Sequence, residues 1–405
     1  MPAPGLPVPD AVLDDLRERV RRTRWPEREP ASAGLTGRAS SWAEGVPLDW
    51  LRELADYWAD EYDWRRTEAR LLALPQRWVD VGGLVVHVVH VRSPHPGALP
   101  LVLTNGWPGS PLEYLDAIGP LTDPPAHGGA AADAFDVVVP SLPGYGLSGK
   151  PAEPGWGVER VAEAWAHVAR ELGYPRYGLH GTDWGVTVAT TLAQRRPVDV
   201  VGLHLAPPLV APDPATLAAP TAAERAALAD LAEASADGDG YTAIQATRPQ
   251  TLGYGLLDSP VGLAAWLLEK VVLWSHPRGL PQTALSRDQL LDAVTWYWVT
   301  GKGASAARLY RESIREVQAV FAEAAGSRAP DAPGGVPGGV VTVPAGASVF
   351  PSEVPRPSRR WAGRRFTDLR WWGEPARGGH FPAWEEPELF VAEVRGFFRT
   401  VRPWS

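Results

Sequence analysis

The fold is decided by the stretch from Tyr177 to Ala189, which reads YGLHGTDWGVTVA. Its pattern predicts a short apolar strand, a tight turn between Gly181 and Gly185, and then a helix. A turn of this kind holds one side chain in a strained, exposed position, and it needs flanking glycines because larger residues would clash. An isolated aspartate more often caps a helix. Because Asp183 lies between the two glycines and follows a strand, we interpret it as a catalytic nucleophile.

The chemistry of this turn depends on an aspartate at the position where such turns commonly carry serine. A carboxylate that attacks a carbon bearing a leaving oxygen or halogen forms an ester, which water can cleave at the carbonyl. A serine attacking the same carbon would form an ether, which general-base hydrolysis does not easily break. The pattern G-x-S-x-G occurs nowhere in the chain. Asp183 therefore indicates alkyl transfer rather than acyl transfer.

Apolar runs on both sides of this turn predict a sheet. Trp78–Val81 and Leu84–Val91 are joined by Gly82-Gly83 and favour an antiparallel hairpin. Later apolar runs alternate with helical patterns, which is typical of parallel βαβ units. These runs are Leu101–Thr104, Phe135–Pro140, Tyr177–His180, Val200–Leu205, Val340–Val343 and Phe366–Trp372. We predict an α/β-hydrolase fold, a doubly wound and mostly parallel sheet with a helical lid and an N-terminal helical extension.

Helical patterns divide the chain into segments. Asp10–Trp25 and Pro47–Trp64 precede the hairpin, and the long helical stretch from Pro207 to Gly303 predicts a lid over the carboxyl edge of the sheet. Gly326–Gly339 is a Gly/Pro-rich connector. The predicted division is an extension at residues 1–75, the first part of the core at 76–206, the lid at 207–311, and the second part of the core at 312–405.

Composition limits the classes of function. The 405 residues carry a net charge of −8 and a pI near 5.7, which argues against nucleic acid or anionic lipid as a partner. The absence of cysteine excludes disulfides, a thiolate zinc site and a cysteine nucleophile. The start of the chain lacks a signal-peptide pattern, and no apolar run approaches the length of a membrane span. We expect a soluble cytoplasmic protein, and its 19 tryptophans suit a pocket for a bulky apolar ligand.

Two glycine-bearing loops follow predicted strands. In this fold the loop Thr104–Ser110 supplies one backbone N–H to an oxyanion hole, and the residue after the nucleophile supplies the other. We predict Trp107 and Trp184 as these donors. The loop Pro140–Pro151 matches a dinucleotide-binding pattern and most of a phosphate loop. However, Pro151 stands where a phosphate loop needs a hydroxyl, so we interpret this loop as a structural turn.

The general base is predicted at His380. It lies on a Gly-Gly loop between the last strand and a final helix, and it completes the chain order nucleophile, acid, histidine. The orienting acid should follow the preceding strand, where Glu353 is found. Glu374 competes because it is closer in sequence, but it lies in the histidine's own loop, from which a side chain seldom turns back to Nδ1. The order of the motifs therefore favours Glu353.

Together these motifs resemble those of the microsomal-type epoxide hydrolases, a family with juvenile-hormone and bacterial members. The similarity runs almost from end to end. It rests on Arg24-Trp25-Pro26, Asp56-Tyr57-Trp58, Asp63-Trp64, Gly106–Ser110, Pro140–Pro151, Asp183-Trp184-Gly185, Gly240-Tyr241, Gln245–Pro249, Arg308-Leu309-Tyr310 with Glu312, Phe350-Pro351 with Glu353, and Gly378–Phe381.

The resemblance implies roles that the residues alone do not assign. In the family a pair of tyrosines hydrogen-bonds and protonates the epoxide oxygen, and the matching segments place this pair at Tyr241 and Tyr310. The resemblance also implies that Glu353 is the acid. The strongest competitor among the ten tyrosines is Tyr297.

The implied reaction is hydrolysis of an epoxide by water to a vicinal diol, through an ester on Asp183 and without a metal or organic cofactor. The Ala-, Arg-, Gly- and Pro-rich composition suggests a bacterial source, and bacterial family members often act on natural products; family habit favours a homodimer. Two features depart from the family. Asn105 replaces the histidine with which the family's oxyanion-loop motif normally begins, which changes the support of that loop, and the membrane anchor of the animal members is not expected here.

Two alternatives stay open. A haloalkane-type dehalogenase shares the fold and the Asp-Trp pair, in which the tryptophan indole holds halide, but Tyr241 and Tyr310 argue against it. A ligand-binding protein on the same scaffold usually has an incomplete set of acid and base groups. Here Asp183, His380, Glu353 and both tyrosines are present.

Overall fold

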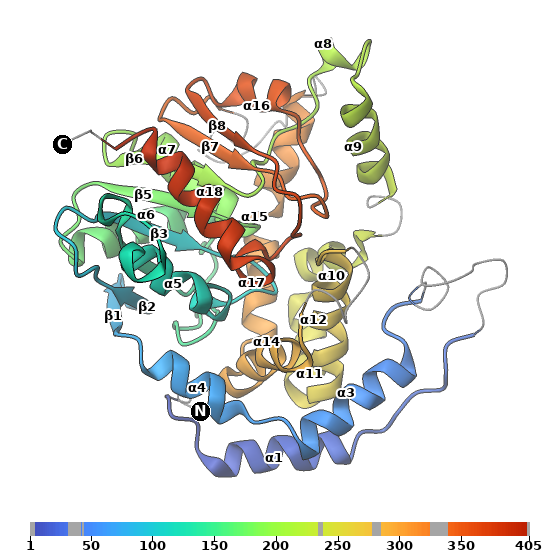
Figure 1. Ribbon diagram of the computed structural model, residues 1–405. Coiled ribbons are helices and arrows are strands. Elements are labelled where there is room, and N and C mark those ends of the chain that lie inside the picture. Colours follow the sequence, from blue (N-terminus) through green and yellow to red (C-terminus); the bar gives the residue numbers. More distant parts are fainter. Residues whose placement is uncertain are drawn as a thin grey trace.

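A central, mostly parallel β-sheet with helices on both faces organises the protein in the computed structural model (Figure 1). The structure describes residues 5–30, 42, 44–233, 238–277, 285–324 and 339–402. Within them the sheet has eight strands in the order β1-β2-β4-β3-β5-β6-β7-β8. Strand β2 is antiparallel to β1 and β4, and the other neighbouring strands are parallel. The predicted doubly wound, mostly parallel sheet is confirmed.

The strands up to β6 form where their apolar runs predict them. The strand bounds are β1 Gln76–Val81, β2 Leu84–Val91, β3 Leu99–Thr104, β4 Phe135–Pro140, β5 Tyr177–Gly181, β6 Val200–Leu205, β7 Ala345–Ser348 and β8 Leu369–Gly373. Strand β8 begins later than the predicted Phe366. The reason is that Phe366 still ends a helix, because its N–H bonds to the carbonyl of Ala362.

Helices cover both faces of the sheet. Helices α5 and α18 pack together on one face, and α6 and α7 pack together on the other (Figure 1). These helices and the short ones near them are η1 Pro111–Tyr114, α5 Leu115–Thr122, η2 Pro124–His127, η3 Ala131–Asp133, α6 Val158–Glu171, α7 Trp184–Arg195, α16 Arg359–Arg365, α17 Pro382–Glu385 and α18 Pro387–Arg399. Because both faces are covered, β4 can carry the consecutive buried valines Val137 to Val139.

The strand that precedes the predicted acid is not the one that the sequence predicts. Val340–Val343 contributes only an isolated bridge at Val341, and β7 is instead the small-residue run Ala345–Ser348. A Cβ on Gly346 would lie 2.4 Å from Cδ2 of Phe397 on α18. The phenyl ring occupies the space that a side chain would need, so close helix packing rather than β-propensity selects the residues of this strand. The connector predicted at Gly326–Gly339 lies, except for Gly339, outside the described residues.

Between β6 and β7 the described chain is helical. It consists of α8 Pro214–Leu217, α9 Ala222–Glu233, α10 Gly240–Thr247, α11 Pro249–Asp258, α12 Pro260–Trp274, α14 Arg287–Thr300 and α15 Gly303–Ala324. Helices α10 to α14 form a group beside the sheet (Figure 1). The domain limits stay a prediction, and the limit at residue 311 falls inside α15. None of the helices that the structure describes is both long and apolar enough to cross a membrane.

The N-terminal helices are α1 Asp10–Arg21, α3 Leu48–Asp60 and α4 Trp64–Leu72, and they contact α12 and α14, two helices of the predicted lid (Figure 1). The helix predicted at Pro47–Trp64 ends earlier, at Asp60. Asp63 caps a separate helix that begins at Trp64, by accepting a hydrogen bond from the N–H of Arg65 at 2.9 Å.

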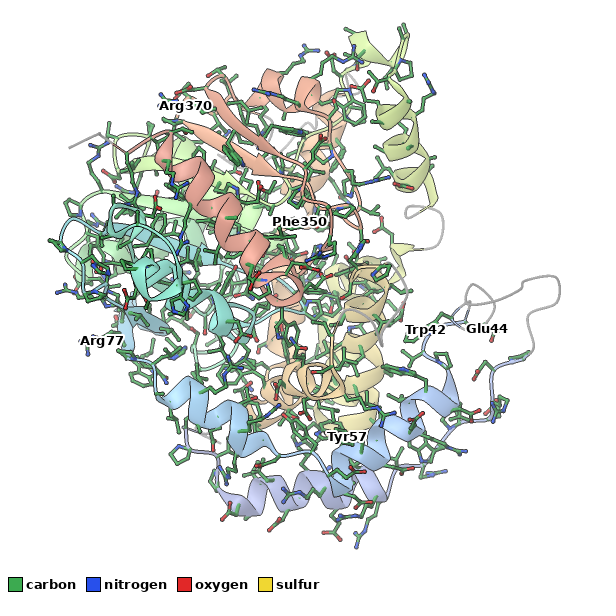
Figure 2. The ribbon with its side chains drawn as sticks, in the orientation of Figure 1. Trp42, Glu44, Tyr57, Arg77, Phe350 and Arg370 are labelled. Carbon is green, nitrogen blue, oxygen red and sulfur yellow. The ribbon has the colours of Figure 1, made fainter. Side chains whose placement is uncertain are left out.

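Side chains of this N-terminal extension form hydrogen bonds with α14. The hydroxyl of Tyr57, labelled in Figure 2, donates to Asp288 at 2.9 Å. Tyr62 donates in the same way to Asp292 at 2.7 Å, in a buried position. The extension therefore contacts the lid through specific polar pairs as well as through its apolar faces.

Candidate active site

Asp183 lies in the turn between β5 and α7. Its backbone angles are φ 51° and ψ −125°, and it is the one non-glycine residue with positive φ in the described part of the chain. The glycines that lie close to Asp183 are required because there is no room for a side chain at their positions. A Cβ on Gly185 would lie 1.9 Å from the carbonyl oxygen of Thr104, and one on Gly106 would lie 1.9 Å from Oδ1 of Asp183. The local sequence therefore creates a strained turn that presents a carboxylate.

Two backbone amides hold one oxygen of this carboxylate. Oδ1 of Asp183 accepts hydrogen bonds from the N–H of Trp107 at 2.9 Å and from the N–H of Trp184 at 2.7 Å. These are the two donors predicted from the sequence. The other oxygen, Oδ2, faces His380. The two oxygens therefore differ in their surroundings before any ligand binds.

The loop that carries Trp107 is supported from several sides. The Asn105 amide donates to the carbonyl of Gly106 at 3.0 Å, and the Tyr297 hydroxyl donates to the carbonyl of Gly109 at 3.0 Å. Buried Glu113 accepts from the N–H of Ser110 at 2.8 Å, and burial raises its pKa to about 8. Tyr297, the competitor for the role of proton donor, therefore has its hydroxyl engaged with this loop.

His380 lies between Asp183 and Glu353. Its Nδ1 lies 2.9 Å from Oε1 and 3.1 Å from Oε2 of Glu353, and its Nε2 lies 3.3 Å from Oδ2 of Asp183 without the alignment of a hydrogen bond. The side chains of Asp183 and His380 are 18% and 12% exposed, so the pair is largely screened from water. Glu374 is exposed and accepts instead from Nε1 of Trp372.

Two opposing effects set the protonation of His380. Burial lowers its pKa, but the charges of Glu353 and Asp183 and their contacts with the ring outweigh burial and raise the pKa well above its ordinary value. The free protein therefore favours the imidazolium form. Removing the charge of Asp183 would remove one of the two influences that hold this proton.

Packing fixes the histidine loop. Gly378 has φ 107°, and a Cβ there would lie 2.5 Å from Phe350, which Figure 2 labels at the start of the loop that carries Glu353. The N–H of His380 donates to the carbonyl of Trp274 at 3.0 Å. The loop is thus fixed both from the acid's side and from the lid.

Tyr241 and Tyr310 project from the lid helices α10 and α15 toward the oxyanion loop. The Tyr241 ring stacks on Trp107, with ring centroids 5.3 Å apart and planes 13° apart. The Tyr310 ring meets Trp107 and Trp184 edge-on at 5.8 and 4.9 Å. Burial, followed by the charge of Asp183, raises the pKa of Tyr241 well above its ordinary value, and burial raises the pKa of Tyr310 in the same direction. Both tyrosines therefore keep their protons at neutral pH.

Two residues of α12 join the site although the sequence did not single them out. The Trp274 ring lies 4.8 Å from the His380 ring, and Nζ of Lys270 lies 4.8 Å from the centroid of the Tyr241 ring. A signal was present, because Glu269 and Lys270 are the charged residues of an otherwise apolar helix. The two charges alone do not show which residue they face, because that depends on tertiary contacts. Among the described residues, no group of three or more acidic or histidine side chains could hold a metal ion.

Comparison with known proteins places this geometry in a family. Residues 4–114 match the family described as epoxide hydrolase N terminus, and residues 100–233 match the alpha/beta hydrolase fold. A putative epoxide hydrolase of Stigmatella aurantiaca is 45% identical over 98% of this chain and 84% of its own length. The chain belongs to the epoxide hydrolase family. The family resemblance inferred from the motifs is confirmed.

Solved structures of epoxide hydrolases share the fold. Aspergillus niger epoxide hydrolase matches with a TM-score of 0.81 and 29% identity, covering 99% of this chain and 97% of that one. Juvenile hormone epoxide hydrolase from the silkworm Bombyx mori matches with a TM-score of 0.81 and 26% identity, covering 97% and 93%. The protein is therefore a hydrolase with the α/β-hydrolase fold.

Proposed function

We propose that this epoxide hydrolase opens an epoxide to a vicinal diol through a covalent ester on Asp183. The observation that carries the proposal is the unequal setting of the two Asp183 oxygens. Oδ1 accepts from two backbone amides, whereas Oδ2 lies 3.3 Å from Nε2 of His380. Oδ2 is then the attacking atom, and Oδ1 becomes the carbonyl oxygen of the ester, already positioned in an oxyanion hole.

Ring opening is the first step. Oδ2 of Asp183 forms a bond to one epoxide carbon while the carbon–oxygen bond breaks and its electron pair moves to the epoxide oxygen. Tyr241 and Tyr310 donate hydrogen bonds to that oxygen, and one of them transfers its proton. Their placement beside Trp107, whose N–H holds the nucleophile, supports this role.

Ester hydrolysis is the second step. Once Asp183 is esterified its negative charge is gone, so the pKa of His380 falls and the neutral imidazole that a base requires becomes accessible. His380, oriented by Glu353, takes a proton from water as the water attacks the carbonyl carbon of the ester. The N–H groups of Trp107 and Trp184 stabilise the negative oxygen. The bond between the Asp183 carbonyl carbon and the diol oxygen then breaks, and that oxygen takes the proton from His380 as the diol leaves. The second proton of the water returns to the tyrosine, which restores the Asp183 carboxylate.

The lining of the site favours an apolar epoxide. The rings of Trp107, Trp184, Trp274 and the two tyrosines pack against one another. Two of these tryptophans bond to the Asp183 carboxylate through their backbone amides, and aromatic walls bind bulky apolar groups. Relatives are named for epoxides, including juvenile hormone epoxide hydrolases. An epoxide from a bacterial natural product, a cytoplasmic location and a homodimer stay predictions.

A single turnover in ¹⁸O-labelled water tests the mechanism. Enzyme in excess over a styrene-oxide-type epoxide is digested, and the peptide that contains Asp183 is weighed by mass spectrometry. We expect ¹⁸O in Asp183 and an unlabelled diol, because water attacks the carbonyl of the ester. A control without epoxide should show no label. Label confined to the diol would refute the ester, and halide release from haloalkanes without turnover of any epoxide would favour the dehalogenase alternative.

A further inference from the structure

Helix α12 presents a buried cation to one of the predicted proton donors. Lys270 and Trp274 are four residues apart and therefore lie on one face of the helix. Nζ of Lys270 lies over the Tyr241 ring, 4.8 Å from its centroid, and the Trp274 ring meets the same ring edge-on at 5.6 Å. Together with the stacked Trp107, these contacts surround the aromatic part of Tyr241.

The position of this ammonium group is costly without compensation. Lys270 is 7% exposed, and a lysine near a surface normally extends its stem so that the charge reaches water. Here Nζ remains over the ring and pairs with Oε1 of Glu269 at 2.7 Å. The Glu269 side chain is 29% exposed, so the pair is only partly buried. A charge retained in this way beside a reacting group indicates a role in the reaction.

We propose that Lys270 is a positioning residue that acts through the Tyr241 ring to favour epoxide opening. This inference rests on the proposed function, in which Tyr241 donates to the epoxide oxygen. As the carbon–oxygen bond breaks, its electron pair goes to that oxygen, which takes the proton from the Tyr241 hydroxyl. The negative charge left on the phenol spreads into the ring. The attraction between ring and ammonium is therefore stronger in the transition state than in the resting state.

The surroundings of Tyr241 explain why such help matters. Burial and the nearby Asp183 charge raise the pKa of Tyr241 well above its ordinary value, which makes the phenol a weaker acid in the free protein. A cation over the ring opposes both effects at the moment of proton transfer. The contact also restrains the ring against Trp107, so that the hydroxyl keeps one direction.

The test separates the two chemical steps. Wild type and Lys270→Met are mixed with excess epoxide, quenched at intervals and weighed intact, which yields the rate constants of ester formation and ester hydrolysis. We expect Lys270→Met to slow ester formation by roughly tenfold and to leave ester hydrolysis within about twofold. Lys270→Arg, which keeps a cation over the ring, should restore most of the loss.

A merely structural role predicts a different result. Helix α12 also holds His380, through the Trp274 carbonyl and ring, so a general disturbance of the helix would slow ester hydrolysis as well. Equal slowing of both steps, or no slowing of ester formation, would overturn the proposal. If Lys270→Met does not fold, Lys270→Gln removes the charge and keeps a polar partner for Glu269, and the same outcomes apply. Lys302→Met removes another buried ammonium, which donates to Ser148, and should leave the ratio of the two rates unchanged.

A double-mutant cycle distinguishes this inference from the function on which it rests. Tyr241→Phe should slow ester formation, and adding Lys270→Met to it should cause little further loss because no phenolate charge develops. If Tyr241→Phe alone leaves ester formation unchanged, the assigned donor is wrong and the proposed function fails at this residue. If Tyr241→Phe slows the step but Lys270→Met does not, only the role of Lys270 is refuted.

Discussion

The half of the site on the sheet and the half on the lid are built in different ways. On the sheet, Asp183, Glu353 and His380 occupy loops after strands, and hydrogen bonds between 2.7 and 3.1 Å fix their polar atoms. On the lid, Tyr241 and Tyr310 are held by ring contacts with centroids 4.9 to 5.8 Å apart. The sheet half has the directional bonds that hold charges, whereas the lid half has adaptable apolar contacts.

This difference suggests that the two halves act in different steps of the reaction. The sheet half contains the proposed nucleophile, the proposed base and the proposed oxyanion donors, which form or cleave the ester in this mechanism. In the same proposal, Tyr241 and Tyr310 of the lid half contact only the epoxide oxygen, which leaves its carbon in the first step. Replacing either tyrosine should therefore affect ester formation alone, while replacing His380 or Glu353 should act mainly on ester hydrolysis.

Asp183→Asn should have the largest effect. The amide has nearly the same shape but lacks the charge that attacks the epoxide, so diol formation should fall by roughly 10⁴-fold or more. Diol measured by chromatography with mass detection checks this, and an unchanged melting temperature shows that the turn is intact. Diol formation near the wild-type rate would show that Asp183 is not the nucleophile, and the division of roles between the sheet half and the lid half would then fail.

His380→Gln should separate the two steps. Asp183 can still attack the epoxide, but no base activates water, so the ester should accumulate. Intact mass spectrometry should show an increase equal to the mass of the epoxide that persists for many turnover times. Rapid loss of the adduct at the wild-type rate would show that another group is the base.

Glu353→Gln should slow ester hydrolysis by about a thousandfold and move its pH dependence. The carboxylate of Glu353 raises the pKa of His380, so removing its charge lowers that pKa. Activity that needs neutral imidazole then rises at a lower pH than in the wild type. The rate of ester hydrolysis, measured between pH 5 and 9, tests the direction of this change. If the rise in rate moved to higher pH instead, the assignment of Glu353 as the partner of His380 would be contradicted.

Tyr310→Phe should slow ester formation by about a hundredfold, because one of two donors to the leaving oxygen is lost. The ring contacts with Trp107 and Trp184 remain, so the oxyanion donors should keep their positions. Ester hydrolysis should stay within about twofold of the wild type. Comparable slowing of both steps would mean that the lid half also shapes the second step.

The two halves differ in how far the sequence reveals them. Gly181 and Gly185 could be interpreted directly, since a strained turn excludes other residues there. Tyr241 and Tyr310 could be named only through the family resemblance, because a helical tyrosine in a lid has the same local pattern whether it packs or reacts. Lys270 was missed, since its contact with Tyr241 is made between helices α10 and α12.

The same physics explains the error in the fold. The valine run at Val340–Val343 has the stronger β-propensity, yet the strand forms at Ala345–Ser348. Phe397 lies against Gly346 at a distance that no side chain tolerates. The residue pattern of one strand carries no information about the side chains of the helix that covers it. The position of the strand is decided here by packing between the sheet and that helix.

Asn105→Ala should have the smallest effect. It tests whether Asn105, which supports the oxyanion loop, affects both chemical steps as expected of the sheet half. The Asn105 amide donates to the Gly106 carbonyl at 3.0 Å in a buried position, next to the residue whose N–H holds Asp183. Losing one such hydrogen bond costs about 1 kcal/mol, which corresponds to a loss of roughly fivefold in rate. Because Trp107 serves both the carboxylate and the oxyanion, both steps should slow together. Slowing of ester formation alone would instead place Asn105 with the lid residues, and unchanged rates would mean that Tyr297 and Glu113 hold the loop without it.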